Sequence, residues 1–139
     1  MDEIARRAGV GVATLYRHFP TRGALMEAVY LAAVQELVAF GESLDAPDPW
    51  DALQAWLGKF VDFMETKQPI ATVLTENSVV YEPTRAAIYA IAQPLFDRAR
   101  SAGYVRPELS ADDVMRVIFA LTGGIYRDER QRQLSLIHI

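Results

Sequence analysis

The sequence predicts an all-α protein in which a small two-helix head is joined by a long helix to a larger helical body. Three observations predict this fold class. Apolar residues recur with helical period from Leu25 onward, residues that favour helix caps and turns separate these runs, and no stretch alternates apolar and polar residues over the length of a strand. A chain of 139 residues, 51% of them hydrophobic, is long enough to bury a core of this kind.

Two short helices are predicted at the start of the chain, over residues 2–8 and 12–18. Gly9 lies between them and can take the left-handed conformation that often ends a helix. The small side chain of Ala5 lets the two helices cross closely. We expect three apolar side chains to fill the space between them: Ile4, Val10 and Leu15.

A long helix follows the head. Thr21 is a suitable N-cap for it, and we expect it to end at Gly41. The apolar residues that define its period are Leu25, Val29, Ala33, Leu37 and Phe40. The segment 41–49 has the composition of a loop, and Asp48 then caps the next helix, which has Pro49 at its first position.

The bounds of the remaining helices are predicted from the residues that end or interrupt them. The helix from Pro49 is expected to stop at TKQP (66–69), and a separate helix should then cover about 70–80. The next helix spans about 83–102, with Pro94 as a kink inside it.

The last predicted helix, 111–126, follows a turn at 101–110, and Ser110 with Asp113 forms a capping pattern at its start. This helix is apolar nearly all round, so it must bury two faces. We expect one face to meet a partner through Val114, Ile118, Leu121 and Ile125.

Composition excludes several classes of protein. The absence of cysteine rules out a disulfide framework, a thiolate zinc site and a cysteine nucleophile. No basic leader precedes an apolar run, and the most apolar stretch, VMRVIFALTGGIY (114–126), is too short to cross a bilayer and contains Arg116. We therefore expect a soluble, cytoplasmic protein.

Charge is distributed unevenly along the chain. The net charge is −4, yet the segment 4–22 contains no acidic residue and four arginines: Arg6, Arg7, Arg17 and Arg22. A basic head on an acidic body fits a protein that binds a polyanion at one end. Chance clustering on a solvated face fits the charge pattern equally well.

The head matches a helix-turn-helix, because two short helices are joined by a glycine-containing turn and the second helix is polar and basic. The second helix would face the major groove of DNA, which is wide enough to admit it. Thr14, Tyr16 and His18 suit hydrogen bonds to phosphates, and Arg22 adds charge at the same surface. A helical hairpin with an incidental polar face is the alternative.

At these residues the sequence resembles the TetR/AcrR family of one-component transcriptional regulators. The match is dense over IARRAGVGVATLYRHFPTRGALMEAV (4–29), and LFDRARSAGYVRPELSADDVMRVIFAL (95–121) is similar to the body of many members. The resemblance implies a homodimeric repressor that leaves its operator DNA when its body binds a small-molecule effector. It assigns contacts with the DNA backbone to Thr14, Tyr16 and His18. It places four others nearest to base edges or flanking phosphates: Gly11, Val12, Ala13 and Arg17.

The same resemblance implies a division into a head at 1–24, a regulatory and dimerisation domain at 25–130 and a disordered or aberrant tail at 131–139. Family members normally carry one more helix before the position of Met1, so we expect a sequence truncated at its start. Because two short helices are marginal without a third to pack on, about 25 further residues should be needed for specific operator binding. The alternative function is a truncated ligand-binding and dimerisation module that does not bind specific DNA.

The body is expected to hold a small apolar pocket with a few polar groups, which is the usual composition of a ligand site. The candidate ligand-binding residues are Trp56, Phe60, Phe63, Met64, Asn77, Tyr81, Tyr89 and Phe119. The alternative is that these side chains only form the core. The sequence does not indicate which ligand would bind.

An enzyme is not predicted. His18 and His138, the only histidines, have no carboxylate at a spacing that suggests metal or proton chemistry, and GVG (9–11) lacks the strand and the further glycine of a phosphate-binding loop. We expect no catalytic residue, no metal and no cofactor.

Overall fold

The structure, a computed structural model, describes residues 1–74 and 79–122, without the side chains of Gln68, Thr72, Val73 and Tyr81. Every regular element in these two ranges is a helix. The helices are α1 (Asp2–Ala8), α2 (Val12–His18), α3 (Arg22–Ser43), α4 (Pro49–Val73), α5 (Tyr81–Ser101) and α6 (Ala111–Thr122). The predicted all-α fold class is confirmed.

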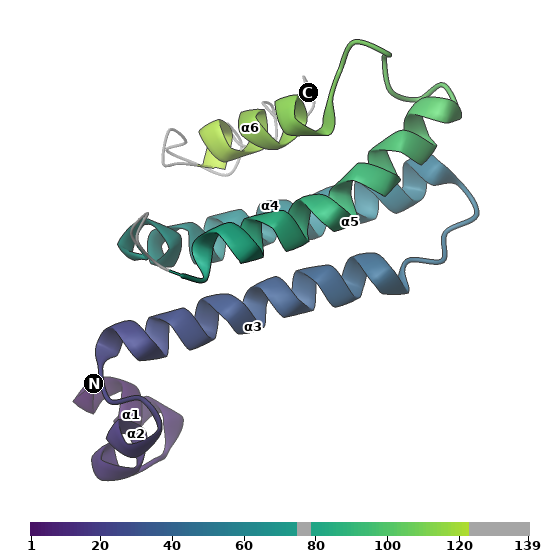
Figure 1. Cartoon of the computed structure of the whole chain (residues 1–139). Helices are drawn as coiled ribbons and strands as arrows, with labels where there is room; N and C mark the ends of the chain where they lie inside the picture. The colour runs from purple at the N-terminus through teal and green to yellow at the C-terminus, as the bar shows by residue number, and fades with distance from the viewer. Residues whose placement is uncertain (75–78, 123–139) are drawn as a thin grey trace.

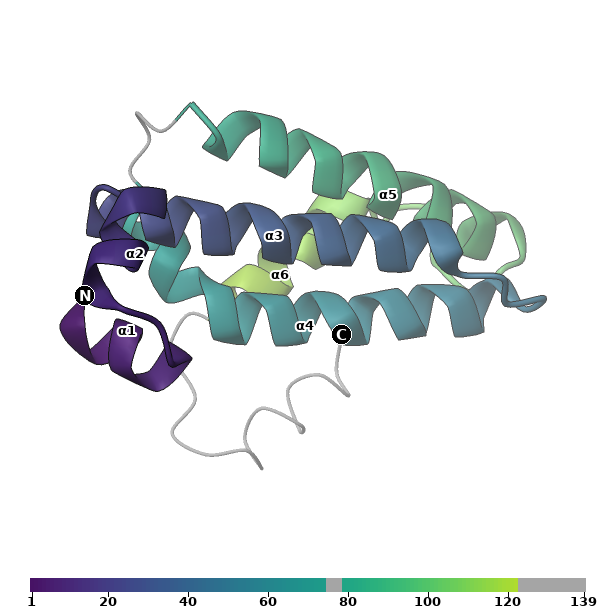
Figure 2. The same cartoon turned by 90° about the horizontal axis from the view of Figure 1, so that it is seen from below.

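The helices form a head and a body (Figure 1). In the body, α3 lies along α4 and α5, and α6 packs across these two helices on the side away from α3 (Figures 1 and 2). In the described part of the chain, α1 and α2 pack closely on each other and not on the helices of the body. The head is therefore joined to the body mainly through the start of α3.

The core of the body draws on α3, α4, α5 and α6. Its largest fully buried side chains are Leu37, Leu53, Trp56, Phe96 and Ile118. By length and composition alone, α3 could also cross a membrane. Its Tyr30, Val34 and Leu37 are buried in the core that this helix shares with α4 and α5.

The helix caps lie at the residues that the sequence predicts. The hydroxyl oxygen of Thr21 accepts the backbone N–H of Ala24 at 3.0 Å, and a carboxylate oxygen of Asp48 accepts that of Trp50 at 2.9 Å. Gly9 has a φ of 69°, as the left-handed end of α1 requires. These three predictions are confirmed.

Two predicted helix ends are wrong. The helix that starts at Pro49 does not stop at 66–69 but continues through Pro69 to Val73, and residues 75–78 of the expected helix 70–80 lie outside the described residues. An internal proline costs about 3 kcal/mol, but here apolar residues on both sides of it, including Met64 and Ile70, pack on the core and offset that cost.

The other incorrect end is at Gly41, because α3 continues to Ser43. Gly41 lies at a close approach of helices. A Cβ atom added there would meet Cγ2 of Ile91 at 2.2 Å and the indole ring of Trp56 at 3.0 Å. The glycine is thus a packing residue and not a helix stop.

Gly41→Ala should therefore lower the free energy of unfolding by about 1–3 kcal/mol, because overpacking against Ile91 and Trp56 outweighs the gain in helix propensity. Gly58→Ala in α4 is the matched control, since nothing lies within 4 Å of its added Cβ atom, and it should stabilise the protein by about 0.5–1 kcal/mol. Urea unfolding measures both. A stabilising Gly41→Ala would contradict the close packing of α3 on its neighbours.

The start of α6 has the predicted capping box. The backbone N–H of Asp113 donates to the Ser110 hydroxyl oxygen at 3.0 Å, and the Asp113 carboxylate accepts the Ser110 backbone N–H at 3.0 Å. The Ser110 hydroxyl group also donates to the Asp113 carboxylate at 2.6 Å, and this hydrogen bond, followed by the one from the Ser110 backbone N–H, holds the pKa of Asp113 below its ordinary value. The two hydrogen bonds to the Asp113 carboxylate stabilise the start of α6 fully above the ordinary pKa of an aspartate, and acidification through the lowered pKa removes this stabilisation.

The predicted partner face of this last helix is wrong in two positions. Val114 and Ile118 are buried within the chain itself, together with Ala111 and Met115. The large apolar side chains that α6 leaves exposed are Val117 and Phe119. Leu121 is half-buried, and Ile125 lies outside the described residues. The period alone could not decide which of two apolar faces the core would take.

Candidate nucleic-acid interface and cavity

The head is held by a very small core. Ala5 is fully buried and Leu15 is 7% exposed, so α1 and α2 meet through these two side chains. The backbone N–H of Val10 donates to the Ala5 carbonyl oxygen at 3.1 Å and fixes the turn. Ile4 and Val10, which the sequence predicts between the helices, are 38% and 43% exposed. That prediction is wrong, because two seven-residue helices cannot enclose four side chains.

The outward face of α2 carries the predicted DNA-contacting residues. The structure leaves most of them exposed: Gly11, Val12, Ala13, Tyr16, Arg17, His18 and, at the start of α3, Arg22. Thr14 is half-buried, and its hydroxyl oxygen accepts a hydrogen bond from Nη2 of Arg17 at 3.3 Å. One short helix therefore presents hydroxyl, imidazole and guanidinium groups together, while Leu15 anchors its other face.

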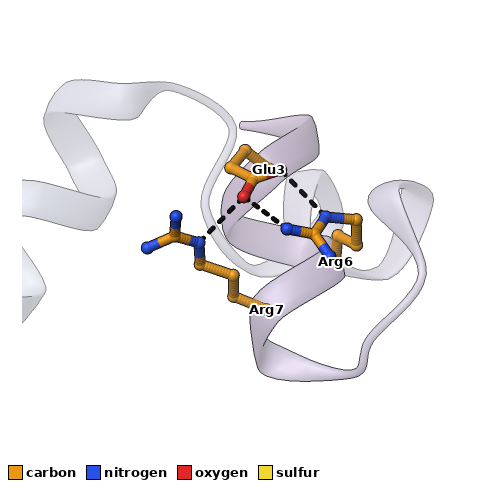
Figure 3. Close-up of polar contacts among 3 residues, drawn as sticks. All are labelled: Glu3, Arg6 and Arg7. Atoms are coloured by element: carbon orange, nitrogen blue, oxygen red, sulfur yellow. Dashed lines mark hydrogen bonds and ion pairs between the residues drawn. The ribbon is translucent and has the colours of Figure 1, made fainter.

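The basic charge of α1 is partly engaged within the head (Figure 3). The carboxylate of Glu3 accepts hydrogen bonds from Arg6 at 2.6 Å and from Arg7 at 2.8 Å. These two guanidinium groups hold the pKa of Glu3 below its ordinary value, Arg6 having the larger effect. This contact was not predicted from the sequence. The prediction of a basic head rested on the segment 4–22, which has four arginines and no acid, and Glu3 lies just before that segment.

Glu3→Gln should release both arginines and raise the affinity for arbitrary duplex DNA several-fold at low salt, with the slope of log affinity against log salt steeper by about 1. Asp2→Asn is the matched control: it removes the same charge from α1, but Asp2 is not the acid that holds the two arginines. Fluorescence anisotropy over a salt series measures both variants. An equal gain from the two substitutions would mean that only net charge matters.

A cavity of about 310 Å³ lies in the body, with lining residues from α3, α4, α5 and α6. Five of the predicted ligand-binding residues line it: Phe60, Phe63, Met64, Tyr89 and Phe119. Trp56 is not among the lining residues, because it is fully buried and its indole stacks on Phe60 at 5.4 Å between ring centroids. Asn77 lies outside the described residues, as does the side chain of Tyr81.

The sequence reasoning missed several residues of this cavity. Tyr30, Ile88 and Met115 contribute to its wall, and Arg85 and Arg116 bring charge to it. The helical period marks Ile88 and Met115 as core residues, but it does not indicate that a space remains between them.

A polar chain lies at the edge of the cavity. The guanidinium carbon of Arg85 lies 5.2 Å from the ring centroid of Tyr89, whose hydroxyl group donates to Oδ1 of Asp112 at 2.6 Å. Nε of Arg116 contacts Oδ2 of the same carboxylate at 2.6 Å. Burial raises the pKa of Tyr89, and the hydrogen bond to Asp112 raises it further, so this phenol is neutral at physiological pH. The hydrogen bond from Tyr89 in turn lowers the pKa of Asp112.

Family models match both parts of the chain. Residues 1–29 match the description "Bacterial regulatory proteins, tetR family", and residues 48–137 match "Transcriptional regulator SbtR-like, C-terminal domain". The chain belongs to the TetR family of transcriptional regulators. The fold, a helix-turn-helix head joined to a helical body, is the one these regulators share.

Individual TetR-family proteins resemble this chain over different lengths. A curated relative, the HTH-type transcriptional activator FasR of Mycolicibacterium smegmatis, is 37% identical over 94 residues, which are 66% of this chain and 43% of the relative. The TetR transcriptional regulator SCO0520 from Streptomyces coelicolor matches with a TM-score of 0.75 and 33% identity, over 96% of this chain and 79% of its own. PfmR from Thermus thermophilus matches with a TM-score of 0.67 and 20% identity, over 99% and 83% of the two chains.

Proposed function

We propose that this TetR-family regulator binds operator DNA through α2 and the start of α3, and that a small effector in the body cavity releases it. The observation that carries the proposal is the division of α2 into one buried anchor, Leu15, and an exposed polar and basic face. In this reading Thr14, Tyr16, His18 and Arg22 contact the DNA backbone. The residues nearest to the base edges or flanking phosphates are Gly11, Val12, Ala13 and Arg17.

The body supports the second half of the proposal through a continuous row of aromatic rings. Trp56 stacks on Phe60, Phe60 lies 6.3 Å from Phe63, and Phe63 lies 5.8 Å from Tyr30, all between ring centroids. Phe60, Phe63 and Tyr30 also line the cavity. Because Tyr30 belongs to α3, which leads directly into the head, an effector that moves these rings would displace the helix that positions α2.

We place this regulator in the cytoplasm, as a homodimer and a repressor. A two-fold dimer brings two copies of α2 to one palindromic operator, and release by an effector is the action of a repressor. The printed name of the relative FasR is that of an activator. Measuring transcription from the selected operator with and without the protein separates repression from activation.

The test of the DNA contacts is a selection of bound sequences from randomised duplexes, followed by affinity measurements on variants. Tyr16→Phe should weaken binding to all selected sequences by about three- to tenfold, because it removes a phosphate contact. Arg17→Ala should weaken binding and also change the preferred bases, since Arg17 lies near the base edges in this proposal. A Tyr16→Phe protein that keeps its affinity but prefers different bases would overturn these assignments.

The second candidate function is a helical ligand-binding and dimerisation module without specific DNA binding. The observation that favours it is the small core of the head, where Ile4 and Val10 remain exposed. Translation of the reading frame upstream of Met1 separates the two cases: a basic, helical continuation supports the regulator, and an immediate stop codon supports the module. Binding assays should use the whole reading frame.

A further inference from the structure

The cavity described above is lined mainly by aromatic and thioether side chains. Of the eleven described residues that line it, five carry an aromatic ring: Tyr30, Phe60, Phe63, Tyr89 and Phe119. Two others are the methionines Met64 and Met115, and the aliphatic members of this lining are Ala71 and Ile88. The wall therefore favours a ligand that gains from contact with rings and sulfur atoms over one that gains only from burial.

The aromatic rings of α4 are already fixed in one orientation. The ring planes of Phe60 and Phe63 are inclined by 19°, with their centroids 6.3 Å apart. Trp56, which does not line the cavity, stacks on Phe60 with the two planes 6° apart. Rings that are packed in this way have little rotamer freedom to lose when a ligand binds. A flat ligand aligned with one of the two phenylalanines is also aligned with the other, as offset stacking requires.

The two methionines give the cavity a second feature that suits an aromatic ligand. Met64 of α4 and Met115 of α6 are 7% and 4% exposed, so both side chains are held in the body. A thioether sulfur makes favourable contacts with aromatic rings, and the unbranched methionine side chain adjusts to an irregular shape. A saturated ligand would gain the second of these effects but not the first.

The volume of the cavity sets the size of the ligand. The cavity measures about 310 Å³, which lies at the lower end of the range for small-molecule sites. An apolar cavity of about 150 Å³ admits one benzene molecule. The space in this body is about twice as large, so it suits two fused rings.

We infer that the cavity binds a planar aromatic molecule of two fused rings, which contacts the rings of Phe60, Phe63 and Phe119. This inference rests on the proposed function, because it names the class of effector for the same cavity. Aromatic pairs stabilise a complex beyond the area that they bury, so a saturated molecule with the same skeleton should bind more weakly. A bound ring that moves Phe63 also reaches α3, since the ring centroid of Tyr30 lies 5.8 Å from that of Phe63.

The test uses 2-naphthol and decahydro-2-naphthol, titrated into the whole protein by calorimetry. The two probes share a fused-ring skeleton and a hydroxyl group, but the saturated probe is not flat and has no π-face. We expect 2-naphthol to bind about three- to tenfold more tightly. Phe63→Leu combined with Phe119→Leu should reduce this preference to less than half, whereas Phe40→Leu, a half-buried ring of α3 outside the lining, should leave it unchanged.

A thermal melt of each variant shows whether the fold is kept. Because Phe119 is 53% exposed, Phe119→Leu alone should leave the fold intact, and it should still lower the preference for 2-naphthol. This single variant decides the matter if the double variant unfolds. The methyl resonances of Met64 and Met115 should shift with 2-naphthol, and those of Met1 and Met26, which do not line the cavity, should not.

Three results would overturn the inference. They are equal or tighter binding of the saturated probe, no binding of either probe at millimolar concentration, and an unchanged preference in the folded variants of Phe63 and Phe119. If 2-naphthol binds as described but leaves DNA affinity unchanged, the inference about the cavity stands and the proposed release from DNA is wrong.

Discussion

Trp56→Ala is expected to lower the free energy of unfolding of the body by about 3–5 kcal/mol, the cost of removing a large aromatic side chain from a core. Trp56 is fully buried, stacks on Phe60 and lies against Gly41 of α3, so its loss opens a space shared by two helices. Urea unfolding followed by circular dichroism measures the change. A loss below about 1 kcal/mol would contradict the packing of α3 on α4.

Trp56→Phe separates the effect of lost side-chain volume on stability from the effect of the buried indole N–H group. The indole Nε1 of Trp56 is buried and has no hydrogen-bond partner in the described part of the chain. An unsatisfied buried N–H group costs about 1–3 kcal/mol, and phenylalanine removes it while keeping an aromatic ring. We therefore expect Trp56→Phe to cost less than half of what Trp56→Ala costs.

The second large effect is expected in the head, where Leu15→Ala should reduce DNA affinity by about a hundredfold or more. Leu15 and Ala5 are the buried side chains that join α1 to α2, and loss of a buried leucine costs about 2–5 kcal/mol. Helices of seven residues do not persist alone in water, so the face of α2 should lose its shape.

The same variant should leave the thermal melt of the body nearly unchanged, because the helices of the head do not pack on those of the body in the described structure. Val29→Ala, which shortens a 38% exposed side chain of α3, is the control and should change neither the melt nor DNA affinity appreciably. Calorimetry and fluorescence anisotropy on one preparation measure both properties. Full DNA affinity in Leu15→Ala would show that α2 is not held as described.

Local signals in the sequence predicted the fold well where one residue decides the structure. Thr21 and Asp48 cap helices, Gly9 ends α1, and Ser110 with Asp113 starts α6, because each of these effects depends on neighbouring backbone groups. The predictions were wrong where packing decides. Pro69 and Gly41 both resemble helix breakers, but burial on both sides keeps each of them inside a helix.

The candidate site, too, could be predicted where local sequence decides the structure and not where packing decides it. The exposed face of α2 could be predicted from residue types and spacing, since a short helix has one anchor and the other side chains point outward. The cavity could be predicted only in part, because Phe60, Phe63 and Met64 follow from the helical period of α4. Tyr30, Arg85 and Arg116 come from three other helices, and only the tertiary arrangement brings them to one space.

The central claim is that α2 enters the major groove, and a DNA-cleaving group attached to α2 tests it most directly. The chain has no cysteine, so Ala13→Cys on the exposed face of α2 provides a single attachment point for an iron chelate. Gln54→Cys on α4 is the control, exposed but on the body. We predict strand cleavage from position 13 at two sites in a selected operator, separated by one helical turn of about 34–36 Å or a multiple of it, and none from position 54. Tight operator binding without cleavage from position 13, or with cleavage from position 54, would contradict the claim.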